Sequence, residues 1–171
     1  MPPSLDVYVL SRLRDRSSIE RFIDAWVDRD ASEDRQDEEL MMLPLSASGA
    51  PEVVDDWEWE PALTLTHAIQ RGLDRPSRAF LLHLKPRGSL VDGVTLGFTA
   101  HDHVVFGVSV HDPFGRDDRL EVAKELLAKL AHEFQGERGY VACGMPVPLA
   151  AGTIPAADAD KVVFSWVRPI S

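Results

Sequence analysis

The stretch Gly93–Val110, GVTLGFTAHDHVVFGVSV, decides the fold of this chain. On both sides of the polar tip Thr99–Asp102, apolar residues recur at every second position, as they do in strands with one buried face. The pattern predicts an antiparallel hairpin. Its core-facing side chains are expected to be Val94, Leu96, Phe98, Val104, Phe106, Val108 and Val110.

Segments on either side of this hairpin have helical periodicity. Ser17 and Glu20 match a capping box, and apolar residues follow at the spacing of one buried helix stripe: Ile19, Phe22, Ile23, Trp26 and Val27. Asp118 and Glu121 repeat the capping pattern before a second stripe of Leu120, Ala123, Leu127, Leu130 and Phe134. Thr64 is expected to cap a short helix that carries Leu65, Ala68, Ile69 and Leu73.

Six other segments are expected to be extended strands. They are Leu5–Leu10, Leu40–Leu45, Asp55–Glu60 (ended by Pro61), Ala79–Lys85 (a central strand covered on both faces), Tyr140–Cys143 and Lys161–Val167. Their order lacks the regular strand-helix-strand rhythm of a doubly wound sheet. The sequence therefore predicts a single α+β domain over residues 1–171, with a mostly antiparallel sheet and helices packed on one face.

Composition narrows the class of protein. A chain of 171 residues can bury one substantial core, and its only cysteine, Cys143, has no partner for an intramolecular disulfide and is expected to be buried. The N-terminus does not resemble a secretion signal, and every apolar run is shorter than a membrane span. We therefore expect a cytoplasmic protein.

The net charge of -10 is concentrated in the segment 28–60. Its only basic residues are Arg29 and Arg35, so twelve acidic residues minus two basic ones account for the whole excess. The acidic residues are Asp28, Asp30, Glu33, Asp34, Asp37, Glu38, Glu39, Glu52, Asp55, Asp56, Glu58 and Glu60. Such a segment repels nucleic acid and anionic lipid and attracts a basic protein. The run Asp30–Glu39 is expected to be too charged to pack.

The pair Trp57 and Trp59 alternates with carboxylates in DDWEWE, so one face of an extended strand carries both indoles. If the indoles are buried, the segment is an edge strand with a charged rim; if they are exposed, they are binding anchors. Either arrangement predicts a surface for a basic partner. Its residues would be Asp34, Asp37, Glu38, Asp55, Asp56, Trp57, Glu58, Trp59 and Glu60.

His101 and His103 at the hairpin tip provide an alternative function, because their spacing could supply two ligands of a metal-assisted enzyme. No third ligand is near them in sequence, and a polar hairpin tip explains both residues more simply. Glycine-rich phosphate loops, nucleophile elbows, HExxH helices and CxxC pairs are absent from the sequence. We accordingly predict no catalytic residues, no metal site and no cofactor.

The block Gly93–Val110, followed by RLEVAKELLAKLAHEF (119–134) and GYVACGMPVPL (139–149), resembles the hairpin-helix-strand modules of small bacterial immunity proteins encoded beside polymorphic toxins. The resemblance covers about residues 79–149 and implies an acidic, compact, non-catalytic inhibitor that covers the active surface of a cognate toxin. It transfers no binding residues, since each such protein fits its own toxin. A homodimeric structural domain that pairs through the hairpin or the acidic strand is a further alternative.

Overall fold

The hairpin predicted over Gly93–Val110 lies in the middle of an eight-stranded sheet in the computed structural model of the chain, which describes residues 4–34, 40–44, 60–62, 64–74, 79–111, 117–144 and 161–169. Its strands are β5 (Gly93–Phe98) and β6 (Val104–His111), paired in antiparallel register with Leu96 opposite Phe106. The strand prediction for this stretch is confirmed.

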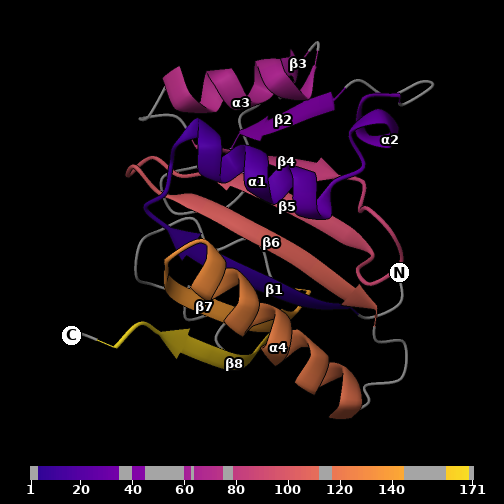
Figure 1. The fold of residues 1–171 in the computed structure, drawn as a ribbon, viewed down its shortest axis with the longest axis vertical. Helices are drawn as coiled ribbons and strands as arrows, with labels where there is room; N and C mark the ends of the chain where they lie inside the picture. Colours follow the sequence, from indigo (N-terminus) through magenta and orange to yellow (C-terminus); the bar gives the residue numbers. More distant parts are fainter. Residues whose placement is uncertain are drawn as a thin grey trace.

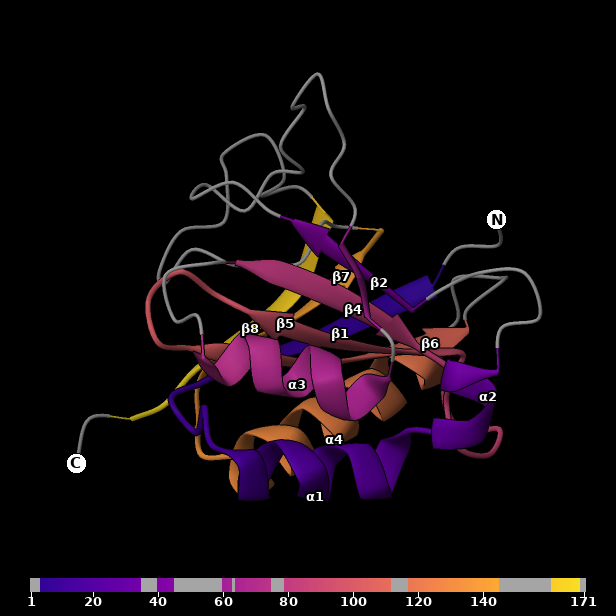
Figure 2. The ribbon, with the colours of Figure 1, turned by 90° about the horizontal axis from the view of Figure 1, so that it is seen from above.

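The other elements complete one antiparallel sheet with helices on one side, as Figures 1 and 2 show. They are β1 (Ser4–Ser11), α1 (Arg16–Trp26), α2 (Arg29–Glu33), β2 (Leu40–Pro44), β3 (Glu60–Ala62), α3 (Leu65–Asp74), β4 (Phe80–Leu84), α4 (Asp117–Glu133), β7 (Gly136–Cys143) and β8 (Val162–Val167). The strand order is β3-β2-β4-β5-β6-β1-β7-β8. The predicted α+β class, antiparallel sheet and one-sided helix layer are confirmed.

The main core lies between the sheet and α1, α3 and α4. Three aromatic rings form its centre, with ring centroids 4.8 Å apart for Phe22 and Phe106 and 4.5 Å apart for Phe106 and Phe134. The predicted stripe of α1 is buried along its whole length, and so are the predicted core-facing residues of β5 and β6. The apolar faces of the strands and of the helices therefore pack against each other in a single layer.

Both predicted capping boxes are misplaced. The N-cap of α1 is Asp15, whose carboxylate accepts hydrogen bonds from the Ser18 backbone N–H (2.9 Å) and hydroxyl (2.8 Å). Aspartate caps as well as serine does, and Asp15 stands two residues before Ser17 in DRSS. Asp118 lies inside α4, which already includes Asp117. Thr64 does cap α3, because its hydroxyl accepts from the His67 N–H at 3.1 Å.

Three further expectations are wrong. Pro61 does not end an extended run but lies within β3, opposite Met41. This is acceptable because β3 is an edge strand, where an N–H need not be donated. On β4, the helix-free face buries Leu81 but leaves His83 exposed, so that strand is not covered on both faces. Cys143, expected to be buried, is exposed at the end of β7.

Gly136 lies where α4 and the sheet approach each other closely. A Cβ placed there would lie 2.5 Å from Val9 Cγ1 and 3.1 Å from the Ala131 Cα. Gly136→Ala should lower the free energy of unfolding by about 1–3 kcal/mol through overpacking. This exceeds the ~0.4–1 kcal/mol that the substitution returns by restricting the unfolded chain.

Urea denaturation measures this difference, with Gly93→Ala as the matched control. A Cβ at Gly93 meets nothing closer than Ser109 Oγ at 3.7 Å. Equal stability of Gly136→Ala and wild type would show that the helix and sheet are not in close contact there.

Candidate protein-binding edge of the sheet

The described part of the acidic segment lies toward one end of the sheet, where β2 and β3 form the edge and α2 lies in the helix layer beside α3 (Figures 1 and 2). Asp34 follows α2 directly, and Glu60 opens β3 opposite Met42 of β2. Asp34 thus lies at the end of α2, and Glu60 lies at the start of the edge strand β3. The other predicted partner-binding residues fall outside the described ranges: Asp37, Glu38, Asp55, Asp56, Trp57, Glu58 and Trp59.

Hydrogen bonds fix α2 against the chain that leaves β4. Asp28 caps α2, with its carboxylate accepting from the Ala31 N–H at 3.0 Å, while its own N–H donates to the Lys85 carbonyl at 3.0 Å. The buried hydroxyl of Ser32 in turn accepts from the Lys85 N–H at 2.9 Å. The expectation that Asp30–Glu39 would be too charged to pack is therefore wrong for residues 30–33 of α2.

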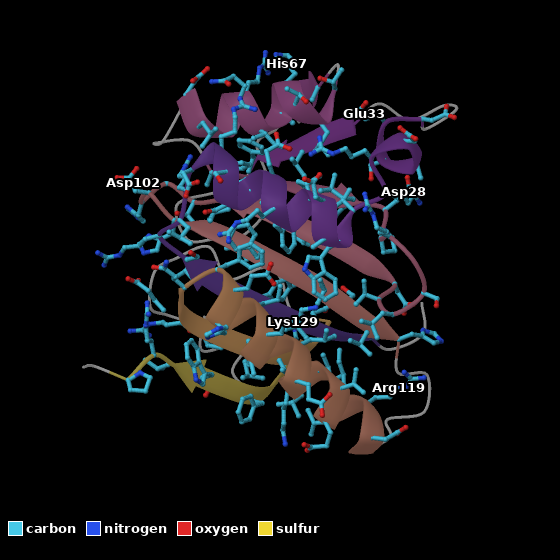
Figure 3. All side chains as sticks on the ribbon, in the orientation of Figure 1. Asp28, Glu33, His67, Asp102, Arg119 and Lys129 are labelled. Atoms are coloured by element: carbon cyan, nitrogen blue, oxygen red, sulfur yellow. The ribbon has the colours of Figure 1, made fainter. Side chains whose placement is uncertain are left out.

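Glu33 joins α2 to α3, since its Oε1 accepts from the Leu65 N–H at 2.7 Å (Figure 3). Together with Thr64, it satisfies two N–H groups in the first turn of α3, which a helix cannot pair internally. A carboxylate at a helix N-terminus is also favoured by the helix dipole. One acidic residue of the segment thus has an internal structural role.

Arg29, the only described cation of the segment, is directed away from it. Its guanidinium forms ion pairs with Glu20 and Asp24 of α1. These interactions raise the pKa of Arg29 despite a lowering contribution from burial, which is the largest single influence. The exposed carboxylates of Asp28, Asp30 and Asp34 have no ion pair with any other described residue. The edge therefore keeps its negative charge.

The two histidines of the hairpin tip do not converge. His101 is exposed, whereas His103 is buried, with Nδ1 2.6 Å from the His101 carbonyl and Nε2 3.3 Å from Glu137 Oε2. Both ring nitrogens of His103 face oxygens of the protein, so neither lone pair is directed at a shared ligand position. In the ranges that the structure covers, no three His, Cys, Asp or Glu side chains are grouped to hold a metal ion.

A buried polar group on the helix-free face of the sheet was not predicted. Asp6 is 8% exposed and accepts hydrogen bonds from Ser109 Oγ (2.7 Å) and Ser4 Oγ (3.4 Å). Beside it, the Tyr8 ring lies over Gly107, where a Cβ would be 2.8 Å from the ring. Burial raises the pKa of Asp6 and, to a larger extent, that of Tyr8. The signal in the sequence is the alternation within LDVYVL, which puts Asp6 and Tyr8 on the face opposite Leu5, Val7 and Val9.

Titration of the purified protein with zinc tests the metal alternative. We expect no stoichiometric binding, because a metal at His103 would have to displace either the His101 carbonyl or Glu137. His101→Ala and His103→Ala serve as controls. A stoichiometric site that both substitutions abolish would restore the enzyme hypothesis.

Asp6→Asn tests the buried carboxyl. Because the folded-state pKa of Asp6 is raised above 3.8, its charged form opposes folding at neutral pH. The penalty is relieved as the pH falls through the folded-state pKa and is gone below the unfolded-state value. The amide removes the charge while keeping an acceptor for Ser109. Asp6→Asn should therefore gain stability over wild type as the pH rises from about 4 to 7. A difference in unfolding free energy that does not change with pH would contradict the assignment.

None of the described helices is long and apolar enough to cross a membrane. No protein-family model matches the chain, and no curated protein matches it in sequence. Among solved structures, the chain is similar to one from the 1.75 Å crystal structure of the toxic C-terminal tip of CdiA from Pseudomonas aeruginosa in complex with immune protein. The match has a TM-score of 0.46 and 12% identity and covers 100% of both chains. A TM-score below 0.5 does not establish a common fold.

Proposed function

We propose that this protein is a protein-binding inhibitor that uses its acidic edge to cover the active surface of a basic partner, such as a toxin domain. The observation that carries the proposal is the concentration of the whole charge excess between Asp28 and Glu60. The helix α2, which carries Asp30, is hydrogen-bonded to Lys85 after β4 and to α3. The segment's cation Arg29 is engaged by α1, so it does not neutralise the edge.

The physical mechanism has two stages. Clustered carboxylates attract a cationic surface over about one Debye length, ~8 Å at physiological salt, and can raise association rates roughly 10- to 1000-fold. Short-range contacts then set the lifetime of the complex, for which Trp57 and Trp59 are the proposed anchors. Inhibition follows if the covered surface of the partner includes its substrate site.

The partner class also follows from charge. A polyanion would be repelled from this edge, and two copies of the protein pairing acidic edge to acidic edge would place like charges against each other. A basic protein would be attracted both by the number of carboxylates and by their clustering. Toxin domains that act on nucleic acid or nucleotides would present such a surface.

Capture from the native host, followed by kinetics with the purified partner, tests this proposal. We expect a protein of net positive charge whose activity is lost at equimolar inhibitor. Neutral isosteres at the acidic residues of this edge should slow association at low salt by at least about tenfold, leave dissociation less affected and flatten the salt dependence. The residues to replace are Asp30, Asp34, Asp55, Asp56, Glu58 and Glu60.

The matched control is Glu125→Gln, which removes an exposed carboxylate from α4, away from the acidic edge. It should leave both the association rate and its salt dependence unchanged. An unaltered salt slope in the edge variants, or equal effects of the edge and control substitutions, would contradict the proposal.

A further inference from the structure

The strand β8 is attached to the fold mainly through β7. It pairs with β7 and with no other described strand, while α4 packs on β1 and β7, the two strands next to it (Figure 1). A register shift between Val141 and Ala142 leaves Val163 without a partner, so regular pairing within β8 runs only over Phe164–Val167. Main-chain hydrogen bonds therefore hold β8 on one side only.

Side-chain packing adds little to this attachment. Val163 is 46%, Phe164 37% and Val167 59% exposed, and these side chains lie on both faces of the strand. Trp166 is the residue of β8 that packs against the main core, where it lies opposite Gly139. A strand that loses few buried contacts on leaving a sheet opens at a lower free energy than the whole domain. β8 therefore meets the conditions for local release.

Release of β8 turns β7 from an inner strand into an open edge. The Arg168 N–H donates to the Glu137 carbonyl at 2.9 Å, so these two residues form a hydrogen-bonded pair. Because such pairs alternate along an antiparallel ladder, the N–H and C=O groups of Gly139 and Val141 also point toward β8. The open edge would present these groups, unpaired, beside the apolar core.

The strand that fits this edge is β8 itself. Its register, the placement of Trp166 opposite Gly139 and the contact of the Phe164 ring with Lys124 Nζ at 5.4 Å are set by its own sequence. Lys124 is also paired with Glu121 at 2.8 Å, so charge does not select a foreign strand here. An identical strand from a second copy recovers every one of these contacts.

We propose that β8 exchanges between two copies of this chain, so that β8 of one copy pairs with β7 of the other in the register seen within one chain. Exchange of an identical element is a low-cost route to a dimer, because the contacts of the monomer are remade. Residues 145–160 join the two strands in sequence, and at about 3.3 Å per residue a chain of this length reaches up to about 50 Å. The inference goes beyond the proposed inhibitor function, because it concerns a second copy of the chain and the other end of the sheet.

Competition between the two β8 strands sets the concentration at which exchange occurs. A strand of the same chain competes at an effective concentration on the order of 1 mM. Since monomer and exchanged dimer contain the same strand contacts, the dimer should accumulate as the protein concentration approaches that value. The net charge of -10 repels one copy from another, so added salt should raise the dimer fraction.

Disulfide trapping between two variants tests the exchange. Arg138 and Val167 are directly opposite in the ladder, in a pair without mutual hydrogen bonds, where the Cα atoms are close enough for a disulfide. One variant carries Arg138→Cys and the other Val167→Cys, both with Cys143→Ser to remove the natural thiol. The variants are mixed at about 1 mM each, warmed below the unfolding midpoint and oxidised with glutathione disulfide. We expect a covalent heterodimer, identified by its mass, because neither variant can form this pair within one chain.

The matched control uses Val163→Cys in place of Val167→Cys. Val163 is also exposed on β8 but has no partner in β7, so it reports the background from collisions between exposed thiols. The mixture of Arg138→Cys with Val167→Cys should give at least about tenfold more heterodimer than the control mixture. Equal yields would overturn the proposal.

Both cysteines in one chain test the same step in the opposite direction. An intramolecular disulfide between Arg138→Cys and Val167→Cys holds β8 on its own β7. The oxidised protein should remain monomeric in sedimentation after incubation at high concentration, and its reduced form should dimerise. Equal dimerisation of the two forms would show that association does not involve β8.

Amide exchange of the wild-type protein tests release without any substitution. The amides of Phe164 and Trp166, which face β7, should exchange through local opening at a lower free energy than those of β1, such as Val7. Exchange of both sets only by global unfolding would show that β8 is not released.

These outcomes are separate from those at the acidic edge, which lies at the other end of the sheet (Figure 1). Absence of β8 exchange would leave the salt dependence of partner association unaffected. Loss of that salt dependence would equally leave the yield of the trapped heterodimer unchanged.

Discussion

The packing of Phe22, Phe106 and Phe134 against one another is the contact on which the rest of the structure depends. One ring comes from α1, one from β6 and one from the turn after α4, with Phe22 and Phe134 in an edge-to-face arrangement at 5.6 Å. Aromatic pairs in this geometry add about 0.5–1.5 kcal/mol each beyond the area that they bury. They hold two helices from distant parts of the chain on the same face of the sheet.

This one-sided packing places the remaining chemistry at the edges and on the opposite face. The apolar stripes of α1 and α4 are buried against the sheet. The charged residues of the described helices therefore lie on their outer surfaces. Hydrogen bonds join α2 to Lys85 and join Glu33 to the first turn of α3. They connect the acidic edge to the rest of the fold. Carboxylates on a fixed support need not be ordered when a partner binds, which lowers the entropic cost of association.

The sequence carried enough information for most of the fold because period-two and helical patterns are local. The alternation in Gly93–Val110 and the stripe of α1 identify buried faces without any long-range contact. The N-cap of α1 was misplaced by two residues because Asp15 and Ser17 are both good caps, and only the backbone conformation distinguishes them.

Contacts between residues that are far apart in the sequence could not be predicted from such local patterns. Arg14 donates to the carbonyls of Gly72 (2.6 Å) and Thr99 (2.6 Å), joining the end of α3 to the hairpin tip. The turn of Arg29 toward α1 and the Glu33 cap are of the same kind, and they decide which carboxylates of the candidate edge remain exposed. The distribution of charge along the sequence identified the acidic segment. Which of its charged groups remain exposed could be seen only in the folded structure.

The two edges of the sheet face the same physical problem and differ in how they meet it. An open edge presents unpaired backbone groups to any passing strand, and natural sheets protect it with short strands, proline and charge. β3 has all three, being three residues long, with Pro61 at its centre and acidic neighbours. Main-chain pairing is therefore disfavoured at β3, so the binding proposed for this edge would rely on side-chain charge. β8 is six residues long and contains no proline, so it lacks two of these protections. The acidic edge is thus protected against strand addition more fully than the β8 edge is.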